Sequence, residues 1–169
     1  ADAWTFSGIQ WISQDLLADM PEKGCLVADL YSKILDSGRV LGMPLDGYWA
    51  DLGTLARLFD AYMTLLKRPD LLAWIRPDLS EALEESGVTV GEQAFLEEGV
   101  KLVAPCVLDG TVRVEAGAVV GPNVYLAPGS VVGAGATLEN VVVLDSVHIN
   151  GHCADQVIWL TGKTKVSNL

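Results

Sequence analysis

The chain has 169 residues, half of them hydrophobic and a fifth charged, so it can bury a core and is not of the disordered type. Its net charge of −11 argues against binding to nucleic acid or to an anionic membrane. No apolar run approaches the roughly 20 residues of a membrane span, and residues 1–10 lack a signal-peptide layout. Three widely spaced cysteines form no zinc-binding pattern. We therefore expect a cytoplasmic protein with reduced thiols.

The first third of the chain mixes predicted strands with predicted helices. Residues 5–12 have the apolar composition of a buried strand. A short helix is predicted over 13–17, with Ser13 as its N-cap. A second helix is predicted over 29–37, and Gly38 is placed to end it.

Two further strand-like runs, 40–44 and 47–49, precede a long amphipathic helix. That helix is predicted from Leu55 to about Lys67, because its apolar residues recur with helical spacing and Thr54 is a suitable N-cap. A layered α/β sheet needs more strands than these. We therefore interpret residues 1–68 as the trailing part of a larger α/β domain.

Residues 69–86 are predicted to form a helical connector. Pro69 and Pro77 interrupt this segment, and short helical pieces are expected over 70–74 and 79–85.

A six-residue repeat dominates the remainder of the chain. Ten aliphatic residues follow one another at intervals of six, and small residues recur four positions after each of them. A period of six fits no amphipathic helix, but it is typical of a triangular coil built from three six-residue strands. The ten residues are Val90, Leu96, Leu102, Leu108, Val114, Val120, Leu126, Val132, Leu138 and Leu144.

The repeat predicts an all-β left-handed parallel β-helix over residues 87–169, with a little over three coils ending near Asn150 and a cap formed by residues 157–160. The aliphatic positions are expected inside the prism. Three acidic residues that directly follow such positions, Glu97, Asp109 and Glu115, are expected to be exposed. Outward valines are expected to contact another subunit in a homo-oligomer; these are Val119, Val131 and Val143.

Three segments resemble the C-terminal half of sugar-1-phosphate nucleotidyltransferases, and most closely the mannose-1-phosphate guanylyltransferase branch. They are Phe6-Ser7-Gly8-Ile9, then Asp29-Leu30-Tyr31, then the stretch from Gly47 to Thr54, which contains a W-x-D-x-G-T motif. A hexapeptide-repeat tail commonly follows the catalytic domain in that branch. The resemblance covers nearly the whole chain.

The resemblance implies a role for three residues. Asp51 corresponds to the aspartate that is a ligand of the catalytic Mg²⁺, and Gly8 and Trp49 correspond to residues beside the sugar. A carboxylate at a strand end, before a glycine and a helix N-terminus, is chemically suited to hold a hard cation near phosphates. If the three residues have only structural roles, Asp51 is an acidic turn residue, Trp49 packs in the core, and Gly8 allows close packing of the backbone. No catalytic residue is assigned within the chain.

The sequence also departs from the family pattern. The Gly-rich nucleotide-cradling loop of G-x-G-T-R type is absent, and so are the upstream metal-binding acid and the Glu-Lys pair for the sugar phosphate. We therefore expect this chain to be the part of an enzyme that lacks its nucleotide-binding half, and to be inactive alone. The complete enzyme would use an NTP and a sugar 1-phosphate and release pyrophosphate.

Two alternatives remain open at this point. Hexapeptide-repeat acyltransferases share the β-helix, and His148 or His152 could then act as general base. In this alternative His148 takes a small inward position of the repeat and His152 the last corner. The other alternative is a non-catalytic module for assembly or regulation.

Overall fold

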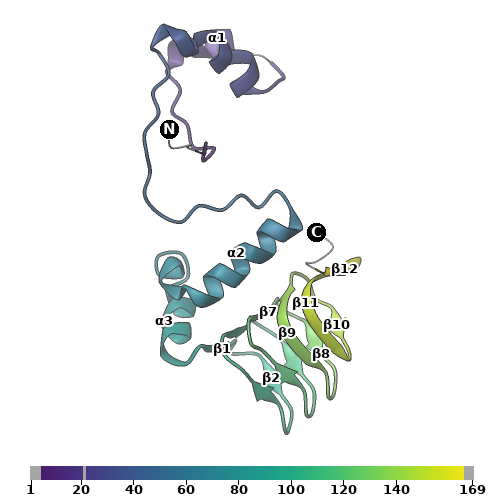
Figure 1. The fold of residues 1–169 in the computed structure, drawn as a ribbon. Helices are drawn as coiled ribbons and strands as arrows, with labels where there is room; N and C mark the ends of the chain where they lie inside the picture. Colours follow the sequence, from purple (N-terminus) through teal and green to yellow (C-terminus); the bar gives the residue numbers. More distant parts are fainter. Residues whose placement is uncertain (1–4, 21, 166–169) are drawn as a thin grey trace. The chain divides into compact units, whose positions relative to one another are not determined.

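The computed structural model describes residues 5–20 and 22–165 (Figure 1). Residues 1–4, 21 and 166–169, which the predicted domains also include, lie outside the described residues. The chain divides into two compact units, residues 1–49 and residues 50–169. The fold is a short helical α/β part followed by a parallel β-helix, as the sequence predicts, and the β-helix has about four turns where a little over three are expected from the repeat.

Four short helical elements lie among the described residues of the first unit. They include the predicted helices, and the second of these is a succession of π, α and 3₁₀ turns that Gly38 ends with a φ of 71°. Ser13 precedes the first helix but makes no side-chain cap hydrogen bond. The elements are η1 (Gln14–Asp19), η2 (Val27–Tyr31), α1 (Ser32–Ile34) and η3 (Leu35–Ser37).

The predicted strands at 5–12, 40–44 and 47–49 are wrong for the chain by itself, because these segments are extended without strand pairing. A strand needs a neighbour for its backbone N–H and C=O groups, and no described strand lies before residue 88. Their apolar side chains are consequently uncovered. Trp11 is fully exposed and Leu41 is 90% exposed.

Three helices open the second unit. The predicted amphipathic helix forms as α2 (Leu55–Lys67), and the Thr54 side chain accepts a hydrogen bond from the Arg57 amide, as an N-cap does. The connector forms η4 (Pro69–Leu72) and α3 (Pro77–Ser86). Each begins at a proline, which suits a first helical position because proline has no N–H to satisfy there.

The β-helix that follows has three faces of parallel strands. In Figure 1 they form the stacked teal to yellow arrows. One face contains β1 (Val88–Val90), β4 (Cys106–Leu108), β7 (Val124–Leu126) and the later halves of β9 (Thr137–Val143) and β11 (His152–Trp159). The second contains β3 (Lys101–Leu102), β6 (Val119–Val120) and the earlier halves of β9 and β11. The third contains β2 (Phe95–Leu96), β5 (Arg113–Val114), β8 (Val131–Val132) and β10 (His148–Ile149).

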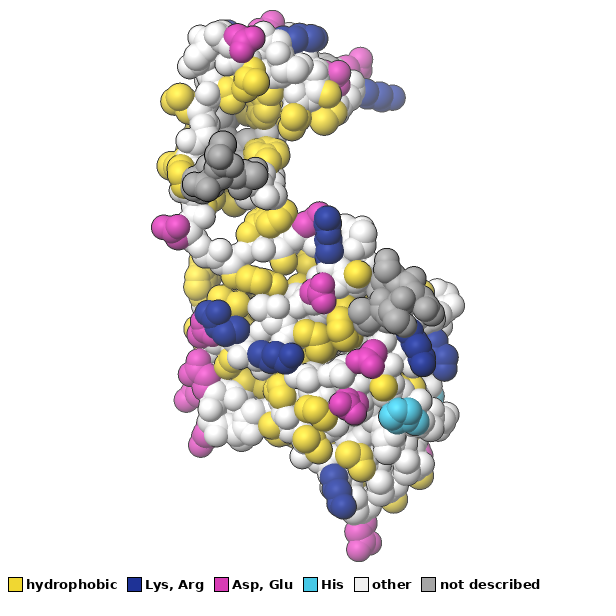
Figure 2. All heavy atoms as spheres, in the orientation of Figure 1, with side chains coloured by type: hydrophobic (Ala, Val, Ile, Leu, Met, Phe, Trp, Pro, Cys, Tyr) yellow, Lys and Arg dark blue, Asp and Glu magenta, His cyan; other side chains and the backbone are white. Residues whose placement is uncertain are grey.

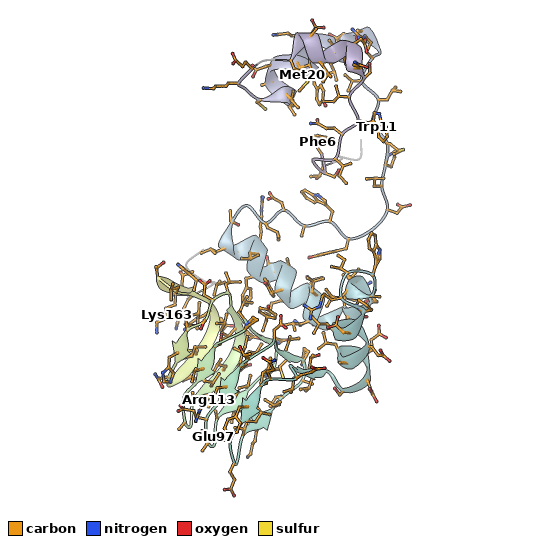
Figure 3. The ribbon with its side chains drawn as sticks, turned by 180° about the vertical axis from the view of Figure 1, so that it is seen from behind. Phe6, Trp11, Met20, Glu97, Arg113 and Lys163 are labelled. Carbon is orange, nitrogen blue, oxygen red and sulfur yellow. The ribbon has the colours of Figure 1, made fainter. Side chains whose placement is uncertain are left out.

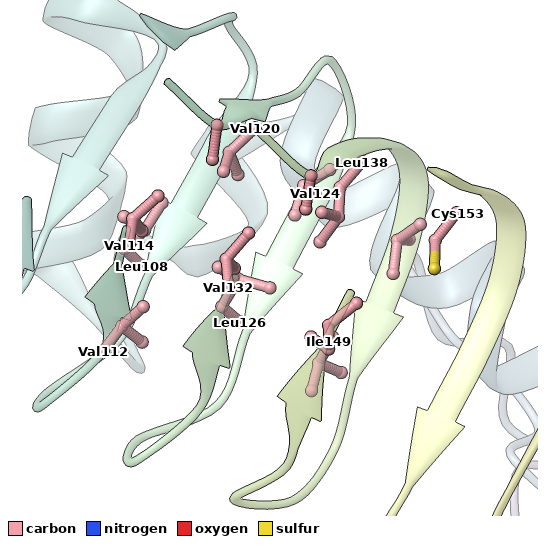
Figure 4. Packing of buried hydrophobic residues seen from close by; sticks show 14 of the residues in the cluster. Leu108, Val112, Val114, Val120, Val124, Leu126, Val132, Leu138, Ile149 and Cys153 are labelled. Atoms are coloured by element: carbon pink, nitrogen blue, oxygen red, sulfur yellow. The ribbon is translucent and has the colours of Figure 1, made fainter. Parts of the chain in front are cut away.

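Aliphatic side chains fill the prism interior, as the repeat predicts. Leu108, Val114, Val120 and Leu126 have no exposed surface (Figure 4). The corners are tight enough to select glycine where the backbone of neighbouring coils converges. A Cβ on Gly121, whose φ is 111°, would lie 1.8 Å from the carbonyl oxygen of Val103.

The repeat shortens by one residue in its third coil, and again before β11, so the prediction for its last members is wrong. Leu126 pairs with Val143 and not with Leu144, so the third coil has one residue fewer than the first two. Val143 is therefore fully buried inside the prism, and Leu144 is displaced toward helix α2. Asn140, at a φ of 52°, forms the tightened corner.

The two ends of the prism differ. At the first coil the inward Val90 is 41% exposed and Leu96 36% exposed, because no further coil stacks on them in the described chain, and Leu102 is only half-buried. At the other end, β11 continues the coils beyond Asn150 and pairs antiparallel with β12 (Gly162–Lys165). The predicted cap over the C-terminal end is therefore a hairpin.

Helices α2 and α3 pack on the first face of the β-helix. Phe59 of α2 contacts the outward side chains of Val142 and Val157. Leu83 of α3 and Leu66 of α2 pack on Val107. Apolar residues at the outward positions of this face are thus buried by the helices, in two clusters that are separate from the prism interior.

Candidate functional site

Gly8 and Trp49 lie in the first unit and are linked by a backbone contact. The indole Nε1 of Trp49 donates a hydrogen bond to the carbonyl oxygen of Ser7, at 3.1 Å. Gly8 has a φ of 85°, and a Cβ there would meet nothing within 4 Å, so its glycine serves backbone conformation and not close packing. Trp49 is 48% exposed, so its ring has a free side.

Apolar side chains crowd the same unit without being covered by it. Phe6 is 55% exposed and Ile9 73% exposed, on either side of Gly8. Figure 3 shows Phe6 and Trp11 projecting from the extended segment, and apolar side chains are plentiful on this unit in Figure 2. This segment is tied to the helices by the Tyr31 hydroxyl, which donates to Gln10 Oε1 at 2.5 Å.

Asp51 lies in the second unit, in the turn before α2. Its Oδ1 accepts a hydrogen bond from the Gly53 amide at 2.8 Å, and its Oδ2 forms an ion pair with Arg57 in the first turn of the helix. The two contacts hold the carboxylate in one orientation. The Asp51 side chain remains 42% exposed, so lone pairs of both oxygens stay accessible.

The carboxylate of Asp51 fits one protein ligand of a Mg²⁺ ion. Such ions take oxygen ligands and usually use only one or two carboxylates, with water and phosphate oxygens completing the shell. Within residues 5–20 and 22–165, no three His, Cys, Asp or Glu side chains gather into a metal-binding group. Sequence reasoning missed Arg57, whose position two residues into the helix could have indicated a contact back to Asp51.

The three acidic residues expected to be exposed are all half-buried, Asp109 included, and two of them bind the next coil. Glu97 is half-buried; it pairs with Arg113, and its Oε2 accepts from the Ala116 amide at 3.1 Å (Figure 3). Glu115 repeats the contact one coil later, accepting from the Ala134 amide at 3.1 Å. A carboxylate at this corner satisfies a backbone N–H of the neighbouring coil, which explains why it is not turned to solvent.

The two histidines do not form a pair. His148 is exposed on the third face, not inward as the uninterrupted repeat predicts, because the coil has shortened before it. His152 is exposed on the second face, where its Nδ1 lies 2.7 Å from the Thr137 hydroxyl. Each imidazole therefore stands alone on a different flat face.

The comparison with known protein families finds a match within the β-helix. Residues 102–159 match the model of the family described as the GMPPB C-terminal domain. The match runs from β3 to the end of β11, which is the stack of coils up to the closing hairpin.

With the β-solenoid, the GMPPB C-terminal domain match fits the C-terminal β-helix part of a mannose-1-phosphate guanylyltransferase, as the resemblance in sequence predicts. This portion of the chain is thus nucleotidyltransferase-like. A search of curated proteins gave no match. Among the described residues, no helix is both long and apolar enough to cross a membrane.

Proposed function

We propose that the chain is the sugar-site and β-helix portion of a sugar-1-phosphate nucleotidyltransferase of the GDP-mannose-forming type. In the complete enzyme the phosphate oxygen of the sugar 1-phosphate attacks the α-phosphorus of an NTP, and pyrophosphate leaves. The observation that carries this proposal is the GMPPB C-terminal domain match over residues 102–159, in the same compact unit as the Asp51 turn.

Five residues have proposed roles. Asp51 supplies one carboxylate to Mg²⁺, which when bound neutralises charge on the phosphates. Arg57 and the Gly53 amide orient that carboxylate, as outer partners of a metal ligand commonly do. Gly8 and Trp49 border the sugar: the open space at Gly8 and the half-exposed indole are both suited to contact a pyranose ring.

The nucleotide-binding half is proposed as the missing partner. Two features support it: the chain has no G-x-G-T-R loop, and the extended segments at 5–12 and 40–44 leave large apolar side chains uncovered. Strands of the other half would pair with these segments and bury them. The 169-residue chain alone should accordingly release no pyrophosphate from GTP and mannose 1-phosphate.

The proposed enzyme is a homo-oligomer to which the β-helix contributes. Two of the valines expected to contact another subunit, Val119 and Val131, are half-buried on faces that no described helix covers. Val143 cannot make such a contact, because it is buried inside the prism. Within the described chain, β1, β2 and β3 of the first coil each have one edge without a strand partner. Light scattering that shows a strict monomer at high concentration would contradict this assembly.

The decisive experiment is a substitution in the complete enzyme that carries this chain. Asp51→Asn keeps the side-chain size and removes the charge, so turnover of GTP and mannose 1-phosphate should fall roughly 100-fold or more. Asp60→Asn is the matched control, since it removes the same charge from the exposed side of α2. Equal turnover of both variants at limiting Mg²⁺ would return Asp51 to the role of a turn residue.

A further inference from the structure

A cavity of about 120 Å³ lies where α2, η4 and α3 meet the first face of the β-helix. Its walls are apolar: leucines of all three helices, among them Leu66, Leu72 and Leu83, face Val107 of β4. Tyr62 and Tyr125 form one side, with ring centroids 4.9 Å apart. An enclosed apolar cavity of about 150 Å³ holds a benzene ring; this smaller pocket is open to solvent on one side, so a ring lies partly inside it and the rest of a ligand lies at its mouth.

One carboxylate stands among these apolar walls. Asp109 Oδ2 accepts a hydrogen bond from the Tyr125 hydroxyl at 3.2 Å and lies 3.8 Å from Arg76 Nη1, which is too far for a hydrogen bond. Its Oδ1 is not among the buried oxygens that lack a hydrogen-bond partner, because the side chain is 23% exposed and this atom reaches solvent. Burial raises the pKa of the Tyr125 hydroxyl, and the neighbouring Tyr62 and Asp109 add to that rise, so the phenol stays a neutral donor.

The charges around the cavity leave a negative excess. The Arg76 guanidinium donates two hydrogen bonds to Asp78, at 3.1 and 2.9 Å, and the positive charge is thereby committed to that carboxylate. Asp109 is the second carboxylate next to the same arginine, so one negative charge is uncompensated. An anionic ligand such as a sugar phosphate would be repelled, whereas a cation with an apolar body is complementary in charge and in surface.

We propose that this cavity is a binding site for a small primary amine with a single aromatic or aliphatic body. The ammonium group donates to Asp109 Oδ1, and the body lies against Tyr62 and the leucine wall. The site is separate from Asp51 and does not depend on the proposed function. It uses a half-buried carboxylate of which one oxygen faces solvent.

The test is a calorimetric titration of the 169-residue chain with three probes of one shape. Benzylamine should bind about tenfold or more tightly than benzyl alcohol, because a charged hydrogen bond replaces a neutral one. Benzoate should not bind. Asp109→Asn should abolish the preference for the amine and leave benzyl alcohol unchanged, whereas Glu81→Gln, which removes an exposed charge from α3, should alter neither.

Leu83→Phe supplies a second variant, since its larger ring fills the cavity and should weaken the amine and the alcohol together. The comparison among probes needs no variant, so it stands even if Asp109→Asn does not fold. Equal affinity for benzylamine and benzyl alcohol in the unaltered chain would overturn the proposal. So would an absence of any benzylamine binding, or an undiminished preference for it in folded Asp109→Asn.

Discussion

The two compact units bury their apolar side chains to very different extents. In residues 50–169, each coil of the prism covers the one before it, and a sixteen-residue cluster lies almost entirely out of contact with solvent. In residues 1–49, Leu16 and Leu30 are buried, whereas Trp11 and Met43 are largely exposed. The composition of the two units is not the cause, because both are rich in apolar residues.

The difference lies in how far apart in the sequence the pairing strands of each unit are. A β-helix strand pairs with a strand about 18 residues away, so any run of several coils closes its own core. The extended segments of the first unit need strands that these residues do not contain. Stability should therefore be concentrated in the second unit, and chemical accessibility in the first.

The largest effect should come from placing a charge inside the prism. Leu126 has no exposed surface, and Leu126→Asp would bury an unpaired carboxylate at a cost of several kcal/mol, comparable with the net stability of a domain. The β-sheet signal in circular dichroism should be lost at 25 °C. Lys101→Asp places the same side chain at an exposed strand position of the second face and should keep that signal. A folded Leu126→Asp protein would mean that the interior is hydrated.

Thiol labelling compares the two units directly. Cys25 of the first unit is exposed, and Cys106 and Cys153 of the prism are buried. Iodoacetamide at pH 8 should modify Cys25 at the rate of an ordinary thiol. It should modify Cys106 and Cys153 at least about 100-fold more slowly. Peptide mass spectrometry gives each rate, and unfolding in guanidinium should equalise them. Rapid labelling of Cys106 in the folded chain would show that the coils open.

The same thiol makes stability depend on pH in the alkaline range. Burial raises the pKa of Cys106 from 9.0 to about 11, so the folded protein holds a proton that the unfolded chain releases first. The stabilisation is complete below pH 9 and is lost as the pH rises from 9 to 11. Cys106→Ala should remove that part of the decline in the denaturation midpoint, although it also leaves a small cavity that lowers stability at every pH.

Sequence reasoning succeeded where a structure is set by local spacing. The repeat predicted that the side chains of Val114 and Val120 point into the prism, and Thr54 predicted where α2 begins. It failed where the local structure depends on residues far away in the sequence or on a choice between equivalent neighbours. The strand at 5–12 has no described partner, and the shortened coil at Asn140 could not be read because Val141, Val142, Val143 and Leu144 offer four equivalent aliphatic residues in a row.

The candidate site shows the same limit. Composition and spacing placed Asp51 before a helix, but the identity of its metal and sugar neighbours came from the family resemblance. The ion pair with Arg57 and the Asp109 cavity were not foreseen. Both depend on side-chain directions, and the cavity also depends on how α2 and α3 seat on the outward side of the prism.

An intermediate effect is expected at the shortened coil. The Asn140 side chain accepts from Asn123 Nδ2 at 2.8 Å and donates to Asp155 Oδ1 at 2.9 Å, so the three residues form a ladder across coils. Asn140→Ala should lower the free energy of unfolding by about 2 kcal/mol, since it loses the ladder and strains a left-handed backbone. Asn140→Gly should cost about 1 kcal/mol, because only the ladder is lost. Urea denaturation would compare them, and equal losses would show that backbone strain is negligible at this corner.

The smallest effect should be at the start of α2, where the second unit meets the candidate site. The Thr54 hydroxyl accepts from the Arg57 amide at 3.3 Å, and Thr54→Ala removes that cap at a cost of about 1 kcal/mol. For a unit of this size the melting temperature should fall by about 4 °C. Thr54→Ser keeps the acceptor and should melt within about 1 °C of the unaltered chain. Because Arg57 also holds Asp51, hydrogen exchange at the Gly53 amide should quicken in Thr54→Ala. Unchanged exchange with a lowered melting temperature would mean that the cap stabilises the helix without ordering the Asp51 turn.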